Sequence, residues 1–188
     1  KIDPQSGTAL EIGSSGDTIT IPSGATIVNS GTQTGFGGTN TPAFMASQNG
    51  DQTISHNTST KITFSNEVID TDSTYDSSTN YRWTPASTGN YMIGAGGWLY
   101  QAGNALDSYE LFIYKNGADI IFPMTKNTNG KFERLFLSAS TIINVGSISD
   151  YYEIYVTQNT TGGGSALFSG SGNSAKFRNY FYGYKLIT

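Results

Sequence analysis

Short apolar stretches, separated by turn residues, run along most of this 188-residue chain. Candidate strands cover residues 43–46, 61–64, 81–84, 89–101, 108–115, 131–139, 142–148, 151–158 and 177–186. Asn-Gly pairs at 49–50, 116–117 and 129–130, and the glycine-rich run 162–165, stand between them. Short strands at regular spacing with turn signals of this kind predict an all-β sandwich or jelly roll.

Two of the predicted strands carry apolar side chains on both faces. Leu111 and Ile113 fall on one face of their strand, while Phe112 and Tyr114 fall on the other. The tyrosine-rich stretch 178–185 has the same property. Because both faces of such a strand have to be covered, we expect one face of the stretch 178–185 to pack the sandwich and the other to pack a neighbouring subunit.

The first 40 residues have a different pattern. Ile12, Ile19 and Ile27 recur at intervals of seven and eight residues, with turn residues at 22–24 and 29–31. Such spacing is typical of a β-stalk whose rungs each turn one branched apolar side chain inward. Two or three rungs do not bury a core, so the stalk should need intertwined chains or a continuing shaft. A flexible Gly/Ser/Thr linker is the alternative interpretation.

A glycine-rich hinge at 35–42 separates this segment from the rest of the chain. The sequence therefore predicts two parts, a β-rich stalk with its hinge at 1–40 and a jelly-roll head at 41–188.

Composition narrows the range of partners. Charged residues make up 13 % of the chain and aromatic residues another 13 %, and the formal net charge is −4. A binding site for phosphate backbones needs clustered Lys and Arg, so nucleic acid is not an expected partner. No apolar run approaches the roughly 20 residues of a membrane helix, so membrane insertion is not expected either. The chain has no cysteine, which excludes disulfides and thiolate metal sites.

A family resemblance rests on the ordered aromatic and glycine residues of the head. The stretch 75–91, Tyr-Asp-Ser-Ser-Thr-Asn-Tyr-Arg-Trp-Thr-Pro-Ala-Ser-Thr-Gly-Asn-Tyr, resembles the signature of C1q-like globular heads, which are relatives of the tumour-necrosis-factor (TNF) jelly roll. Further stretches are similar to that family's opening strands, central hairpin and closing strand, namely 42–44, 60–64, 111–117 and 181–186. The resemblance spans about 42–187 and implies a ten-stranded, two-sheet jelly roll that forms a homotrimer, with its termini near one end.

The stalk carries a second resemblance. Residues 17–31 are similar to segments that precede C1q-like heads in bacteriophage tail-fibre proteins, especially marine ones. This resemblance implies a place at the tip of a virion fibre, or otherwise outside the cell. The chain has neither a collagen repeat nor cysteine, so complement and hormone roles are not carried over from animal members.

Catalytic chemistry has little support in the residues. His56 is the only histidine, and no Gly-x-Ser-x-Gly elbow is present to supply an activated serine. A glycosidase would need two facing carboxylates, and the sequence does not pair any of the candidates. These candidates are Glu67, Glu110, Glu133, Asp150 and Glu153. We therefore expect a protein that is not an enzyme and holds no organic cofactor.

One acidic loop is a candidate metal site. Asp70, Asp72 and Asp76 could gather three carboxylates, the ligands that Ca²⁺ prefers, although the glycine and distant glutamate of an EF-hand are missing. The favoured interpretation is that these aspartates form Asx-turns that shape the loop.

Two further features could contribute to ligand contact. The glycine-rich loop 162–173 is expected to be a long crossover that exposes Leu167 and Phe168. Trp83 and Trp98 could stack on sugar rings, but both lie in predicted strands, where core packing is the more common role.

These observations together predict a non-catalytic, trimeric adhesion head of a phage tail fibre. Its expected partner is a host-surface glycan or an outer-membrane component, bound by neutral polar loops at the end far from the stalk. A glycan depolymerase tip, a capsid decoration trimer and a bacterial surface-layer head remain the alternatives.

Overall fold

The computed structural model describes residues 12–28, 30–31, 42–103, 105–120, 124–169 and 178–186, and of 124–131 it describes the backbone alone. The chain divides into two compact units, Lys1–Gly38 and Thr39–Thr188. The described residues include no helix long and apolar enough to span a membrane.

The described residues of the first unit, 12–28 and 30–31, contain turns, form no strand and are all exposed. Ala25 donates its N–H to the carbonyl of Pro22 at 3.1 Å, and Gly24 has the positive φ of a type II turn. The turn predicted at 22–24 is therefore confirmed. The rungs expected around Ile12, Ile19 and Ile27 do not form strands in the single chain, and a stalk of several intertwined chains stays a prediction.

The second unit, the head, consists of β-strands joined by turns and loops in its described part. The strands are β1 Ala43–Ser47, β2 Gln52–Ile54, β3 Thr60–Lys61, β4 Asn66–Asp70, β5 Tyr75–Asp76, β6 Arg82–Trp83, β7 Gly89–Tyr100, β8 Leu106–Lys115, β9 Ala118–Asp119, β10 Met124–Phe132, β11 Arg134–Val145, β12 Tyr152–Thr160, β13 Ala166–Phe168 and β14 Tyr180–Lys185. The all-β prediction is confirmed, and several two- or three-residue strands add to the ten expected.

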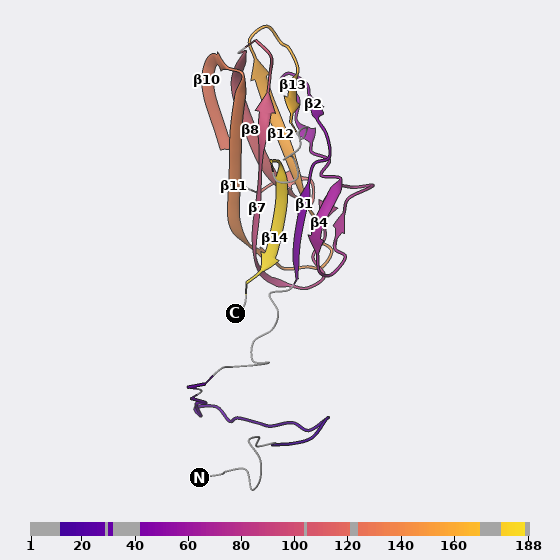
Figure 1. Ribbon diagram of the computed structural model, residues 1–188, viewed down its shortest axis with the longest axis vertical. Helices are drawn as coiled ribbons and strands as arrows, with labels where there is room; N and C mark the ends of the chain where they lie inside the picture. Colours follow the sequence, from indigo (N-terminus) through magenta and orange to yellow (C-terminus); the bar gives the residue numbers. More distant parts are fainter. Residues whose placement is uncertain are drawn as a thin grey trace. The chain divides into compact units, whose positions relative to one another are not determined.

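These strands form two sheets that face each other (Figure 1). Sheet A has the order β2-β13-β7-β14-β1-β4, and β11 pairs with the other edge of β7. Sheet B has the order β10-β8-β12-β6-β5, with β3 added to β12 and β9 added to β8. Non-consecutive strands are neighbours in both sheets, as in a jelly roll.

The predicted break between strands 131–139 and 142–148 was wrong. The structure has one continuous strand there, β11, which pairs residue by residue with β7 from Arg134 opposite Tyr100 to Val145 opposite Gly89. The unbroken pairing with β7 keeps the polar middle of β11 extended, although the sequence pattern there suggests a turn. Asn129-Gly130 was also expected to be a turn between strands, but it lies inside β10, where the pairing register with β8 shifts.

The Asn-Gly turn at 116–117 is confirmed. Asn116 and Gly117 both have positive φ, 52° and 84°, which is the conformation of a type I′ hairpin. Tyr114 pairs with Asp119 across this two-residue turn, so the turn joins β8 directly to β9.

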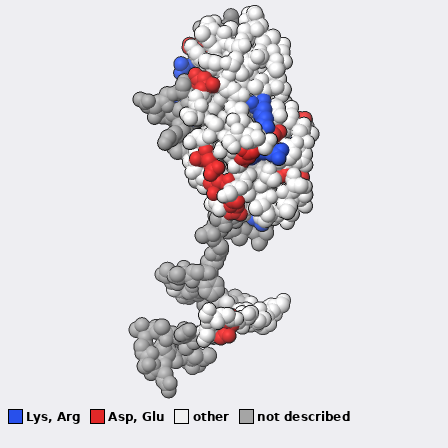
Figure 2. All heavy atoms as spheres, turned by 90° about the vertical axis from the view of Figure 1, so that its right-hand side faces the viewer, with Lys and Arg blue, Asp and Glu red and all other residues white. Residues whose placement is uncertain are grey.

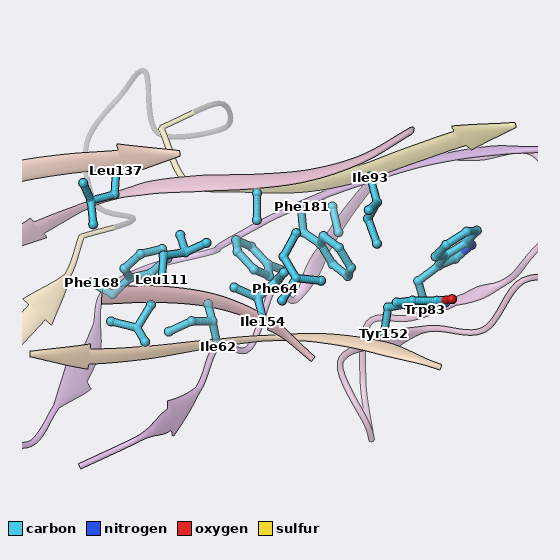
Figure 3. Packing of buried hydrophobic residues seen from close by; sticks show 14 of the residues in the cluster. Ile62, Phe64, Trp83, Ile93, Leu111, Leu137, Tyr152, Ile154, Phe168 and Phe181 are labelled. Carbon is cyan, nitrogen blue, oxygen red and sulfur yellow. The ribbon is translucent and has the colours of Figure 1, made fainter. Parts of the chain in front are cut away.

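The core lies between the two sheets and is rich in aromatic rings (Figure 3). Sheet A contributes Ile93, Leu137, Phe168 and Phe181, and sheet B contributes Trp83, Leu111, Tyr152 and Ile154. Ile62 and Phe64 are also fully buried, although the strand expected at 61–64 is limited to β3 and ends before them.

Two of the aromatic residues considered for ligand contact belong to the core. Trp83 is buried there, as the more common role predicted. Phe168 was expected to be an exposed contact residue, but it is fully buried, with its ring 6.2 Å from that of Phe64. The reason is that β13 joins sheet A between β2 and β7, and this pairing turns Phe168 toward the core.

The head begins and ends at the same place. Lys185, at the end of β14, donates its N–H to the carbonyl of Pro42, just before β1, at 3.0 Å. The next residue, Leu186, donates to Asn90 at the start of β7. The opposite end of β7, at Trp98 to Tyr100, is therefore the end of sheet A remote from the head's termini, as Figure 1 shows.

A close contact inside the core gives a test of this packing. A Cβ at Gly97 would lie 2.2 Å from Cζ of Phe168, so Gly97→Ala should force the ring or strand β7 to move and destabilise the head by about 1–3 kcal/mol. Gly146→Ala is the matched control, because a Cβ there meets nothing within 4 Å. Chemical denaturation of both variants would check this, and equal stabilities would contradict the packing described.

Candidate interaction surface

The outer face of sheet A carries a continuous series of aromatic rings. Tyr180, Tyr182 and Tyr184 alternate along β14, with centroid distances of 6.0 Å and 6.5 Å between successive rings. The series continues through Phe136 on β11, 6.5 Å from Tyr180, to Trp98 on β7, 5.3 Å from Phe136. We call these five residues the aromatic row.

The tyrosines lie flat on the sheet because β7 has glycines opposite them. Tyr182 pairs with Gly94 and Tyr180 pairs with Gly96 in the register of β14 on β7. A Cβ at Gly94 would come within 2.7 Å of the Tyr182 ring, and one at Gly96 within 2.9 Å of the Tyr180 ring. The glycines thus let the rings cover the backbone of the neighbouring strand.

The aromatic row is uncharged and still partly accessible in the single chain. Strand β7 has no charged residue, β11 has only Arg134 at its start, and β14 has only Lys185 at its end. Trp98 is 40 % exposed and Phe136 is 39 % exposed, and burial raises the pKa of the Tyr180 hydroxyl above its ordinary value. A neutral aromatic surface of this kind is suited to contact with another protein.

The outer face of sheet B differs from this surface. The rings of Tyr114 and Tyr155 are stacked there at 4.3 Å, but Lys61 and Glu153 form an ion pair of 2.5 Å beside them. The outer face of sheet B therefore carries charged groups among its rings, unlike the aromatic row. Figure 2 shows another side of the head, where uncharged residues dominate and charged side chains form small groups.

His56 has a structural role. Its Nδ1 accepts the backbone N–H of Thr160 at 3.1 Å, and its Nε2 lies 2.9 Å from the side-chain amide of Asn57. These contacts join the turn after β2 to the end of β12. The imidazole has no carboxylate or activated serine among these partners, so the contacts do not form a catalytic triad.

Two of the candidate acidic residues are engaged by lysines. Asp150 forms an ion pair with Lys115 at 2.8 Å, and Glu153 forms the pair with Lys61. The Lys115 ammonium, followed by the Asn116 amide, holds the pKa of the Asp150 carboxyl below its usual range. A general acid in a glycosidase needs the opposite shift.

The three aspartates of the candidate calcium loop are spread over two strands and a turn. Asp70 in β4 accepts the N–H of Tyr75 at 2.7 Å, and Asp72 accepts the Thr71 hydroxyl at 3.0 Å. Asp76 in β5 accepts N–H groups from three residues of the following turn, at 2.8–3.1 Å. The bonds from the N–H of Ser78 to Asp76 and from the N–H of Asp72 to Asp70, the latter at 3.3 Å, are Asx-turn contacts of the kind that the favoured interpretation expects.

Within the described ranges, no group of three or more His, Asp or Glu side chains lies close enough to hold a metal ion. Calcium binding at this loop stays an untested prediction.

Comparisons with known proteins agree with this geometry at the level of the fold. No family model matches the chain, and no curated protein matches it. Among solved structures, Eiger TNF from S. frugiperda is 12 % identical over 77 % of this chain and 92 % of its own, with a TM-score of 0.53. The head has the TNF/C1q jelly-roll fold.

Two further solved structures support that assignment. The globular domain of zebrafish complement 1qA protein is 12 % identical over 78 % of this chain and 98 % of its own, with a TM-score of 0.51. Murine APRIL is 8 % identical over 77 % and 98 %, with a TM-score of 0.54. At such low identities the likeness concerns the fold.

Sequence reasoning found part of the aromatic row. It found that the stretch 178–185 is apolar on both faces and expected one face to pack against a neighbouring subunit, but it did not decide which face, and it did not connect the tyrosines with Phe136 or Trp98. The glycines at 94 and 96 carried the missing signal, because alternating glycines in an apolar strand indicate that something packs closely against its backbone.

The turn after β5 gives a testable dependence on pH. The N–H groups of Thr79 and Ser78 hold the pKa of Asp76 far below its usual range. Because the folded pKa is lowered, this stabilisation is present above the ordinary pKa of about 3.9 and is lost as the pH falls through the folded value.

We therefore expect Asp76→Ala to lower the free energy of unfolding at pH 7 by about 0.5–2 kcal/mol, as for other capping aspartates. Asp119→Ala, at an exposed position in β9, should change it little. Denaturation curves from pH 7 to pH 2 should show the difference between wild type and Asp76→Ala shrinking in acid. A difference that grows in acid would refute the role of the ionised carboxylate.

Proposed function

We propose that this chain is the non-catalytic, homotrimeric adhesion head of a bacteriophage tail fibre, which attaches the virion to a host-surface glycan or outer-membrane component. The observation that carries the proposal is the aromatic row on a TNF/C1q jelly roll. Its rings are partly open to solvent in one chain, and a trimer contact over β14 would cover Phe136 and the three tyrosines.

The chemistry of this surface supports trimerisation. A threefold axis brings each head against two copies of itself, so an uncharged face can be covered without a second gene product. Each Å² of apolar surface removed from water contributes about 25 cal/mol, so covering the exposed ring of Phe136 and the partly exposed tyrosines beside it favours association. The C1q-like resemblance of the head also implies a homotrimer.

Binding without turnover agrees with the state of the polar groups. The Asp150 and Glu153 carboxylates are paired with lysines, and His56 fastens a turn. These contacts give the three groups a part in holding the fold.

A place on a tail fibre is supported by the first unit. Residues 17–31 resemble segments that precede C1q-like heads in phage fibres, and their described apolar side chains are exposed in the single chain. Such side chains would be covered by intertwining with two further copies.

The trimer contact can be tested with one substitution. Tyr182→Asp would place a charge in the proposed contact, at a cost on the order of several kcal/mol, and should convert the trimer to a monomer. Tyr114→Asp is the matched control, since Tyr114 lies on the outer face of sheet B, and this variant should remain a trimer. Light scattering reports the mass and circular dichroism confirms that the strands are retained. A monomeric wild type would overturn the proposal.

Adhesion can be tested on whole cells. The wild-type trimer should bind host cells, and the Tyr182→Asp monomer should bind roughly a hundredfold less well because avidity is lost. Chromatography of the supernatant should show no released oligosaccharide. Release of oligosaccharide would favour a depolymerase, and equal binding by monomer and trimer would show that avidity plays no part.

A further inference from the structure

A hollow of about 220 Å³ opens at the Trp98 end of the aromatic row. It is lined by Trp98, Tyr100, Arg134, Ser169 and Arg178. These residues come from the end of β7, the start of β11 and the segments next to β13 and β14. Four parts of the chain that are distant in sequence therefore meet at the end of sheet A remote from the head's termini.

The walls of the hollow are held by buried hydrogen bonds. The Asn179 side chain, which is fully buried, accepts the N–H of Trp98 at 2.8 Å and donates to the side chain of Gln48 at 3.0 Å. Ser169 donates its N–H to the carbonyl of Trp98 at 2.9 Å. Trp98 is thus fixed from two sides, so the backbone around the hollow is set before any ligand arrives.

The charge of the hollow is positive, in contrast to the net charge of −4 of the whole chain. Two of its five lining residues are arginines, none is acidic, and neither guanidinium forms an ion pair with the described part of the chain. Arg134 lies over the ring of Tyr100, 4.9 Å from its centroid, which orients its planar group. A pair of guanidiniums without carboxylates selects an anionic ligand, and their fork geometry matches a carboxylate.

The remaining lining residues suit a sugar. The indole of Trp98 is partly exposed and can stack on the apolar face of a pyranose ring, while the Ser169 hydroxyl can bond a sugar hydroxyl. Pockets for drug-sized ligands span about 300–1,000 Å³, so this smaller hollow accommodates about one sugar ring.

We propose that this hollow binds a carboxylate-bearing sugar residue of a host-surface polysaccharide, with Arg134 and Arg178 on the carboxylate and Trp98 against the ring. This inference rests on the proposed function, because it names the ligand class and the site of the adhesion head. Threefold symmetry places the three hollows of a trimer at the same end of the axis, where one acidic polysaccharide can engage more than one of them.

The test uses the full chain, shown to be trimeric by light scattering. Oligosaccharides of glucuronate, of N-acetylneuraminate, of glucose and of glucose phosphate, together with a short single-stranded oligonucleotide, are titrated by calorimetry. The carboxylate sugars should bind at least tenfold more tightly than the glucose oligosaccharide, and their affinity should fall as salt rises. Tighter binding of glucose phosphate or of the oligonucleotide would overturn the assignment to a carboxylate sugar.

Single substitutions test whether the carboxylate sugar binds in this hollow. Arg134→Gln and Arg178→Gln should each weaken carboxylate-sugar binding about tenfold or more, and Arg178→Lys should weaken it less because the charge is kept. Arg82→Gln is the matched control, since Arg82 lies over the Tyr151 ring on sheet B, 4.4 Å from its centroid. All four variants should remain trimers, because these arginines lie outside the core. An equal loss with Arg82→Gln would show that general charge, and not the hollow, attracts the ligand.

The two proposals fail in different ways. Host-cell binding that persists at full strength in the Arg134→Gln, Arg178→Gln double variant would overturn the hollow as the site and leave the adhesion head intact. Absence of host-cell binding by the wild-type trimer, together with tight binding of free carboxylate sugars, would overturn the host-attachment role and leave the hollow as a sugar site.

Discussion

The packing of strand β14 against β7 is the contact on which the rest of the head depends. β14 turns Phe181 into the core, where its ring lies 4.9 Å from that of Phe44, and turns Tyr180, Tyr182 and Tyr184 to the outside. Strand β7 can pair with β14 beneath these tyrosine rings because Gly94 and Gly96 have no side chains that would separate the rings from the sheet. One pair of strands therefore builds the interior and the surface proposed for trimer contact.

The same two strands connect that surface to the candidate sugar site. The hydrogen bond from Trp98 to the buried Asn179 lies just beyond the last tyrosine, so the backbone that presents the aromatic row also sets one wall of the arginine hollow. Assembly and ligand binding would then share a rigid support, and the binding loops would lose little conformational entropy on contact with a cell. Sheet B, which carries the Lys61–Glu153 ion pair, closes the core from the other side.

Much of the head's architecture could be predicted from local patterns. Strands β7, β8 and β12 are long and apolar, so their existence and approximate bounds were visible, and Asn116-Gly117 specified its own hairpin through two positive φ angles. The errors fell where pairing overrides local preference. The sequence at 138–141 suggests a turn, but the pairing with β7 keeps β11 extended. Phe168 follows a glycine-rich stretch and was expected in a loop, but it lies in β13, which pairs with β7 in sheet A.

The sequence by itself determined the all-β class, the short strands and the two apolar faces of the stretch 178–185, because alternation and turn chemistry act over a few residues. The tertiary structure alone decided which rings meet and which charges gather. Trp98, Phe136 and Tyr180 come from three strands, and Arg134 and Arg178 are 44 positions apart in the sequence. Their proximity depends on the register of β11 and β14 on either side of β7, and that register is set by burial in the core, which no local pattern contains.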